Sequence, residues 1–195
     1  MKIIGVTGSF GTGKTYVSSV FGLLGAKVID ADRVGRSVLK TGSVVHREVV
    51  SAFGRKILAP DGSISRKKLA GVVFSDKKSL TRLNGMTHPG IIKRIREIVL
   101  RSGRKGIIVI DAPLLFEAKF ENFVDYIVVV RASLKKQVER CGKKFCLKRG
   151  EVLGRIRSQM PLRTKARYAD FIVDNDGTKA GTRKQVIKIW RKVWR

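Results

Sequence analysis

Short runs of Val and Ile recur along the chain, separated by longer stretches with helical periodicity. The runs contain little polar alternation, which is typical of a parallel sheet covered by helices on both faces. They predict five strands, the last the weakest, at residues 2–7, 26–30, 106–111, 125–130 and 171–173. Because helical stretches alternate with these strands, we expect βαβ units and therefore an α/β fold with a doubly wound parallel five-stranded sheet.

The interval between the second and third predicted strands is much longer than a single crossover needs. Within it, Ile91, Ile95 and Val99 recur at helical spacing, and basic residues such as Lys93 fall on the other side. We therefore expect residues 32–102 to form a helical insertion. Such an insertion would sit over the carboxyl ends of the strands, where open α/β sheets bind ligands.

A second helical stretch, residues 133–165, is strongly basic and is loosened by Gly142, Gly150 and Gly154. This composition is typical of a mobile lid rather than of a core element. We call it the lid segment. Residues 1–31, 103–132 and 166–195 then remain as the core.

The sequence VIKIWRKVWR near the end of the chain predicts an amphipathic helix. Its apolar face contains Val186, Ile189, Trp190 and Val193. We expect this helix to dock on the sheet. A basic helix that binds a membrane or RNA is the alternative.

The segment GSFGTGKT fits the phosphate-binding pattern G-x-x-x-x-G-K-[ST] and directly follows the first predicted strand. Its glycines allow positive φ angles, so several backbone N–H groups can surround one anion at the start of the following helix. The ammonium of Lys14 can then reach the β- and γ-phosphates of ATP, and the Thr15 hydroxyl can bind Mg²⁺. The predicted nucleotide-binding residues are Gly8, Ser9, Phe10, Gly11, Thr12, Gly13, Lys14 and Thr15.

Acidic residues follow the predicted strands at the same edge of the sheet. Asp30 and Asp32 close the second strand, and Asp111 closes the third. A carboxylate at this edge can hold Mg²⁺ or accept a proton from an acceptor hydroxyl, although capping a helix or turn is the alternative role. We favour Asp32 as the general base, because it opens the insertion, and we expect Asp111 to lie nearer the metal.

The charge of the chain is unusual, with 42 Lys and Arg against 15 Asp and Glu and a formal net charge of +27. Such a surface attracts polyanions, and either a general basic bias or a nucleic-acid partner could account for it. No apolar run is long enough to span a bilayer, and no secretory signal is evident, so we expect a cytoplasmic protein. Cys141 and Cys146 lack nearby histidines and are expected to be free thiols. Nothing in the sequence predicts an oligomeric state.

Several motifs, taken in order, resemble the dephospho-CoA kinase family across nearly the whole chain. The pairing of VIDAD with DAPLLFE is far more specific than the phosphate-binding pattern alone. The motifs are GVTGSFGTGKT, LGAKVIDAD, FGRKIL with DGSISR, His88–Pro89, DAPLLFE, Gln137 with Arg140, Gln159, and ADFIVDNDG.

The resemblance implies a P-loop kinase core, a CoA-binding insertion and a lid. It implies transfer of the ATP γ-phosphate to the ribose 3′-hydroxyl of dephospho-CoA, the last step of coenzyme A biosynthesis. Carried over by position, Asp32 would be the base. His88 and Pro89 would shape the acceptor pocket, and Leu115, Phe116 and Glu117 would line it. For His88, a position at the start of a helix is the alternative.

The lid departs from the family pattern in one respect. Many members have Arg-x-x-x-Arg, but here Arg140 is followed by Lys144, which lacks the planar fork of arginine. Either Lys144 takes the role of the second arginine, or a neighbour such as Arg149 does. Ser9 and Phe10 also replace the commoner Gly-Ile of the loop. The predicted catalytic residues are Lys14, Asp32, Arg140 and Lys144.

Two other functions remain open. One is a different P-loop small-molecule kinase, of the nucleoside monophosphate kinase type. The other is a basic P-loop ATPase that binds nucleic acid, which would show ATP hydrolysis stimulated by nucleic acid. The absence of a recognisable nucleic-acid module and the shortage of aromatic residues argue against the second.

Overall fold

Five parallel strands form one sheet in the order β2–β3–β1–β4–β5 in the computed structural model, which describes residues 1–73, 76–103 and 105–194. The predicted parallel five-stranded α/β fold is confirmed. The strands are β1 (Lys2–Gly8), β2 (Lys27–Asp30), β3 (Ile107–Asp111), β4 (Tyr126–Arg131) and β5 (Phe171–Asp174).

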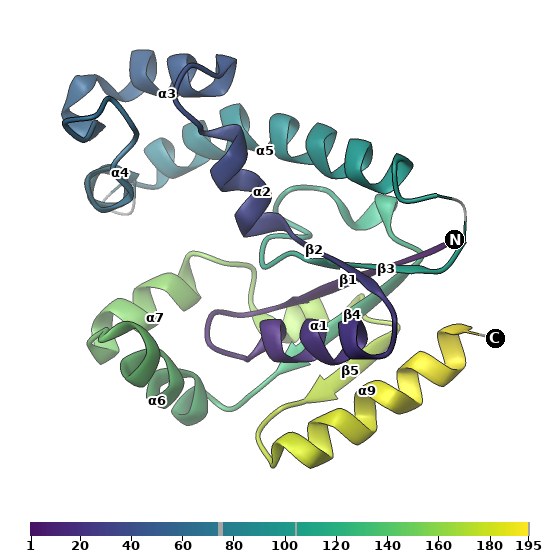
Figure 1. Cartoon of the computed structure of the whole chain (residues 1–195). Helices are drawn as coiled ribbons and strands as arrows, with labels where there is room; N and C mark the ends of the chain where they lie inside the picture. The colour runs from purple at the N-terminus through teal and green to yellow at the C-terminus, as the bar shows by residue number, and fades with distance from the viewer. Residues whose placement is uncertain (74–75, 104, 195) are drawn as a thin grey trace. The chain divides into compact units, whose positions relative to one another are not determined.

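The contacts of the chain divide it into two compact units (Figure 1). Residues 1–30 and 103–195 form the first unit, and residues 31–102 form the second. The helices of the first unit are α1 (Lys14–Leu23), the short 3₁₀ helix η2 (Glu121–Phe123), α6 (Leu134–Phe145), α7 (Arg149–Arg157), α8 (Leu162–Arg167) and α9 (Lys179–Trp194). Those of the second unit are α2 (Ala31–Val38), α3 (Val44–Phe53), the 3₁₀ helix η1 (Arg55–Ile57), α4 (Arg66–Val73) and α5 (Lys77–Leu100).

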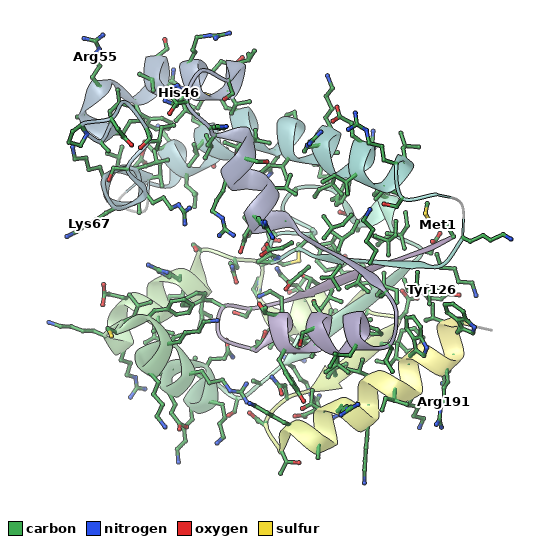
Figure 2. The ribbon with its side chains drawn as sticks, viewed as in Figure 1. Met1, His46, Arg55, Lys67, Tyr126 and Arg191 are labelled. Atoms are coloured by element: carbon green, nitrogen blue, oxygen red, sulfur yellow. The ribbon has the colours of Figure 1, made fainter. Side chains whose placement is uncertain are left out.

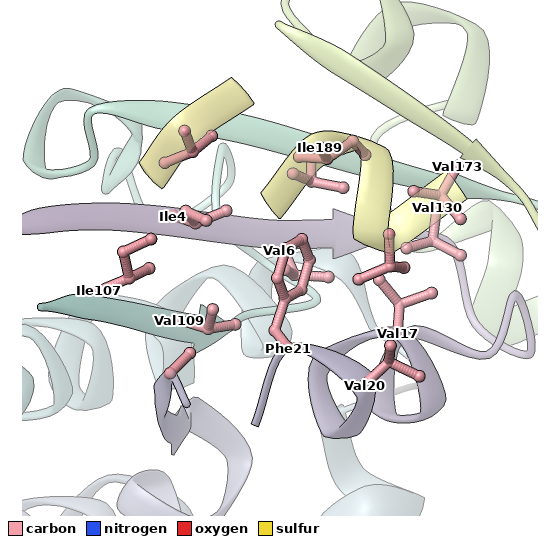
Figure 3. Packing of buried hydrophobic residues seen from close by; sticks show 14 residues of the cluster. Ile4, Val6, Val17, Val20, Phe21, Ile107, Val109, Val130, Val173 and Ile189 are labelled. Atoms are coloured by element: carbon pink, nitrogen blue, oxygen red, sulfur yellow. The ribbon is translucent and has the colours of Figure 1, made fainter. Parts of the chain in front are cut away.

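The main core of the first unit lies between the sheet and helices α1 and α9, which pack against each other (Figure 3). Alternate residues of β1, Ile4 and Val6, face these helices and are fully buried. Ile189 of α9 packs into the same cluster, which confirms that the C-terminal helix docks on the sheet. Gly5 faces the other way, where Leu115 packs against it. The central strand β1 is therefore covered on both faces, as its continuous apolar character predicts.

The second unit has its own apolar core, formed by Val49, Phe53, Ile57, Leu69 and Val73. Side-chain caps fix where its helices begin: the Ser43 hydroxyl accepts the N–H of His46 at α3, and Asp76 accepts the N–H groups of Lys78 and Ser79 at α5. His46 is buried within this unit, whereas Arg55 and Lys67 are exposed (Figure 2).

The lid segment contains three helices, α6, α7 and α8, instead of one continuous stretch. The αL conformation of Cys146 ends α6. Both cysteines are free, Cys141 buried and Cys146 exposed. Among the helices that the structure describes, none is long and apolar enough to cross a membrane.

Candidate active site

The segment Gly8–Thr15 forms a loop between the end of β1 and the start of α1, which begins at Lys14. Gly11 and Gly13 have φ angles of 82° and 88°, a region that side chains other than glycine rarely adopt. The loop therefore presents successive backbone N–H groups together with the positive end of the α1 dipole, which is an anion-binding arrangement.

Hydrogen bonds within the loop fix its shape. The hydroxyl of Thr12 donates to the Ser9 carbonyl oxygen over 2.9 Å. The ammonium of Lys14 folds back and donates to the same oxygen over 3.3 Å. Lys14 thus lies across its own loop, where a bound phosphate would meet both the ammonium and the backbone amides.

Asn175, in the turn that follows β5, anchors the loop from behind. This buried amide donates to the Thr12 carbonyl over 2.8 Å and accepts from the Thr182 hydroxyl of α9 over 2.8 Å. A Cβ atom on Gly13 would overlap the Asn175 Nδ2 atom. Gly13 is therefore required for close approach as well as for its backbone conformation.

Arg140 of α6 joins this network. Its guanidinium donates to the Asn175 carbonyl over 2.6 Å and to the Thr12 carbonyl over 3.3 Å. One lid-segment arginine is thus held on the backbone of the phosphate-binding loop. Lys144, one helical turn later, is exposed, and its Nζ atom lies 5.4 Å from the centre of the Phe145 ring. Arg149, the possible substitute, is exposed at the start of α7.

Acidic strand ends meet at the same edge of the sheet as the loop. Asp111, the buried last residue of β3, pairs in register with Asp30 on β2 and with Val6 on β1. Thr15 lies exposed in the first turn of α1. A hydroxyl and a carboxylate are the oxygen ligands that Mg²⁺ accepts beside phosphate oxygens, so this donor set suits the metal. Among the described residues, no group of three or more His, Cys, Asp or Glu side chains could hold a metal ion by itself. Phosphate oxygens would have to supply the other ligands.

Glu117 forms a buried ion pair with Lys165 of α8. The fully buried Nζ atom of Lys165 lies 3.0 Å from Oε1 and 3.2 Å from Oε2 of Glu117, and it donates to the Pro113 carbonyl over 2.6 Å. Glu117 also accepts the N–H of Met160 over 2.8 Å. Burial lowers the pKa of Lys165 below its ordinary value, and the Glu117 carboxylate opposes this change. These bonds tie the lid segment to the segment after β3.

Leu115 and Phe116, two of the residues expected to line the acceptor pocket, are both buried. Leu115 is fully buried, and its methyl carbons lie against Gly5. Phe116 packs against the Tyr168 ring, with 5.6 Å between the ring centres. Leu115 supports β1 from within the core, and its side chain is not exposed to an acceptor.

The second unit contains a pocket of about 580 Å³. One face of α2 supplies Asp32, Gly35 and Arg36, and Leu39 follows directly after the helix. The remaining lining residues are Lys40, Thr41, Ser63, Ile64, Arg66 and Leu69. One carboxylate thus lies among three cations, beside a small apolar wall.

His88 and Pro89 lie in the middle of α5, so the alternative that placed His88 at the start of a helix is wrong. The next residue, Gly90, allows α5 to approach α2 closely. A Cβ on Gly90 would lie 2.9 Å from a methyl carbon of Val38 on α2. Neither His88 nor Pro89 lines the 580 Å³ pocket.

Sequence reasoning assigned no role to three residues that contact the phosphate-binding loop: Asn175, Gln159 and Arg155. A usable signal existed for Asn175. It follows the fifth strand as Asp111 follows the third, so the rule that polar residues gather at strand ends should have included it. Gln159 had a signal of another kind, because it is among the residues that carry the family resemblance, whereas Arg155 had none.

A glycine-rich loop followed by a helix that begins at Lys14, at the carboxyl edge of a parallel five-stranded sheet, defines a P-loop nucleoside-triphosphate-binding protein. Comparison with known proteins specifies the family. The dephospho-CoA kinase family model matches residues 2–181. The chain belongs to the dephospho-CoA kinase family and is an ATP-dependent kinase.

The relatives match along almost their full length. A dephospho-CoA kinase of Carboxydothermus hydrogenoformans is 42% identical over 194 residues, covering 98% of this chain and 94% of the relative. A solved Thermus thermophilus structure is similar with a TM-score of 0.85 and 28% identity, covering 100% of this chain and 98% of that one. The dephospho-CoA kinase from Campylobacter jejuni is similar with a TM-score of 0.70 and 28% identity, covering 99% and 98%.

Proposed function

We propose that the chain transfers the γ-phosphate of ATP to the ribose 3′-hydroxyl of dephospho-CoA, giving CoA and ADP, with Lys14 and Asp32 as the central catalytic residues. The observation that carries this proposal is the 580 Å³ pocket of the second unit, in which Asp32 lies with Arg36, Lys40 and Arg66. Dephospho-CoA carries a pyrophosphate and a ribose hydroxyl. Three cations suit the first group, and a carboxylate suits the second.

The donor half of the reaction belongs to the phosphate-binding loop. The backbone amides of Gly8–Thr15 and the Lys14 ammonium neutralise charge on the transferring group, which is where a phosphoryl-transfer enzyme gains most. Arg140, already bonded to the Thr12 carbonyl, is placed to add a further positive charge. Lys144 would do so after a change in its side-chain conformation.

Asp32 serves as the base that orients the acceptor hydroxyl and takes its proton late in the transfer. It follows the end of β2 by two residues, so the chain itself ties it to the edge of the sheet that carries Asp30 and Asp111. Its exposed position in the first turn of α2 leaves the carboxylate accessible to an acceptor. His88 and Pro89 are proposed to shape the acceptor site, with Phe116 and Glu117 supporting it.

The Thr15 hydroxyl and the Asp111 carboxylate would hold Mg²⁺ that arrives with ATP. The metal supplies additional neutralisation of the phosphate oxygens. Lid closure would exclude water, which limits hydrolysis of ATP without transfer.

An acceptor panel tests the proposal. The protein is incubated with Mg·ATP and separately with dephospho-CoA, AMP, CMP and shikimate, and the products are followed by mass. We expect only dephospho-CoA to gain a phosphate. A phosphorylated AMP or CMP would instead assign the chain to the nucleoside monophosphate kinase type.

Asp32→Asn tests the role of the base. Loss of a positioned base lowers the turnover number by roughly 10²- to 10⁴-fold, and the KM for ATP should change little. Glu48→Gln removes an exposed carboxylate of the same unit that does not line the pocket, and it should leave turnover unchanged. Full activity of Asp32→Asn would remove Asp32 from this role.

Lys14→Ala tests the donor site. It should abolish transfer and leave the circular dichroism spectrum intact, because Lys14 lies in the phosphate-binding loop, outside the apolar core of the first unit. Surviving transfer would contradict the phosphate-binding assignment.

A further inference from the structure

Phe10 lies within the phosphate-binding loop, yet its ring packs against the lid segment. The ring stacks on Phe145 at the end of α6, with 5.6 Å between centres and 23° between planes. On α7, the guanidinium carbon of Arg155 lies 5.2 Å from the centre of the same ring. The backbone N–H of Phe10 donates to Gln159 Oε1, just after α7, over 3.0 Å. One loop residue therefore contacts three parts of the lid segment.

The neighbouring glycine brings α6 equally close. A Cβ on Gly11 would lie 2.7 Å from the Cys141 Sγ atom and 2.9 Å from the Gln137 carbonyl oxygen. Cys141 belongs to α6 and is 1% exposed, so its thiol is buried where α6 meets the loop. The lid segment is thus seated on the loop at two consecutive residues.

Before a nucleotide binds, repulsion between positive charges opposes the packing of the lid segment on the phosphate-binding loop. Burial raises the pKa of the Cys141 thiol, and the positive charges of Arg155, Lys14 and Lys144 offset part of that effect. Like charges gathered at a loop repel one another. Ring stacking and a cation over an aromatic face are attractive contacts that work against this repulsion.

We propose that Phe10 is a positioning residue that holds α6 and α7 on the phosphate-binding loop, so that Arg140 and Arg155 lie beside the triphosphate before the acceptor binds. The proposal rests on the proposed function only in taking the triphosphate to be ATP. Phe10 acts through the lid segment and has no direct part in the chemistry.

The buried thiol of Cys141 provides a native reporter of this contact. In a Cys146→Ser background, the rate of alkylation by iodoacetamide, measured without nucleotide, reports how often α6 leaves Gly11. We expect Phe10→Ala to raise this rate about tenfold, because the ring contacts that favour the seated state are lost. Phe10→Leu should raise it by a smaller factor, since it keeps bulk but not the aromatic face. Phe10→Tyr should restore the slow rate.

Arg157→Ala is the matched control, because it removes an exposed cation of α7 two residues from Arg155. It should alkylate at the wild-type rate. The urea midpoint of each variant, read by circular dichroism, separates local opening from global unfolding. An unchanged alkylation rate in Phe10→Ala and Phe10→Leu would overturn the proposal. So would rate increases that simply follow a lower urea midpoint.

Kinetics supply an independent readout. Phe10→Ala should raise the KM for ATP about tenfold and change kcat by less. Arg155→Ala should raise the KM for ATP when it is made in the wild-type protein. It should raise the KM little further when it is combined with Phe10→Ala, because the two residues act through one contact. Fully additive effects would contradict this. If the wild-type protein made no CoA, the proposed function would fail, and the alkylation rates would still decide the role of Phe10.

Discussion

Gly13 is a residue at which two physical constraints coincide. Its φ of 88° belongs to the left-handed region, and the space that a side chain would fill is occupied by the amide of Asn175. Asn175 in turn is held by Thr182, so the shape of the phosphate-binding loop depends on residues more than 150 positions away in the sequence. A local glycine motif is therefore completed by a distant buried amide.

Gly13→Ala should displace the loop. We expect kcat/KM to fall roughly 100-fold, because a shift on the order of 1 Å in a positioned group has that effect. Steady-state kinetics with varied ATP would measure it.

Gly25→Ala is the matched control: its φ is also positive, at 105°, but no atom lies within 4 Å of its added Cβ. It should lower the free energy of unfolding by about 1–2 kcal/mol and leave kcat/KM unchanged. Equal kinetic losses in both variants would mean that backbone strain alone matters.

Helix α8 is short, and a single buried lysine fastens it. Lys165 reaches the Pro113 carbonyl and Glu117, while Glu117 also accepts the N–H of Met160. The four other described ion pairs are all exposed and stabilise little. At this end, the lid segment is attached to the core by one buried ion pair and the hydrogen bonds of its two members.

Lys165→Met should lower the free energy of unfolding by on the order of 3 kcal/mol, because the carboxylate of Glu117 is left without its cation. Urea denaturation would measure it. Arg163→Met, an exposed cation of the same helix, should stay within about 0.5 kcal/mol of wild type. Adding Glu117→Gln to Lys165→Met should recover part of the loss. A further loss in the double variant would show that the carboxylate is stabilised by other groups.

Two glycines of α5 separate helix propensity from packing. Gly85 has no atom within 4 Å of an added Cβ, whereas Gly90 would crowd Val38 of α2 at 2.9 Å. Gly85→Ala should therefore stabilise the protein by about 0.8–1 kcal/mol. Gly90→Ala gains the same propensity but must displace Val38, so its free energy of unfolding should be lower than that of Gly85→Ala. Urea midpoints would compare them, and equal gains would contradict close packing of α2 on α5.

The net charge of +27 acts on the whole molecule. Many like charges on a compact chain repel one another, and the same field attracts anionic substrates. Salt weakens both effects, because the Debye length falls from about 30 Å at 0.01 M to about 8 Å at 0.15 M. The charge therefore favours substrate encounter at some cost in stability.

Raising NaCl over this range should increase the free energy of unfolding and also raise the KM for ATP. Urea denaturation and initial rates, measured in the same buffers, would test both directions. A fall in stability with salt would mean that favourable ion pairs outweigh the repulsion.

The elements that were predicted correctly are those with a strong local pattern. The Val and Ile runs located all five strands, and the glycine motif located the loop. The order of the strands was not predicted, because register between distant segments leaves no mark in either one. Two residues depart from local rules. A proline usually breaks a helix, yet Pro89 lies inside α5, and lysine usually stays at the surface, yet Lys165 is fully buried.

The central position of β1 has a consequence for how the protein is made. Ile4 pairs with Val109 on one side and with Tyr126 on the other, both more than 100 residues later in the chain. On the ribosome, the strand that leads into the phosphate-binding loop therefore waits for its neighbours, while the helices of residues 31–102 can already pack together. During that interval, its apolar residues stay exposed and can associate with other chains.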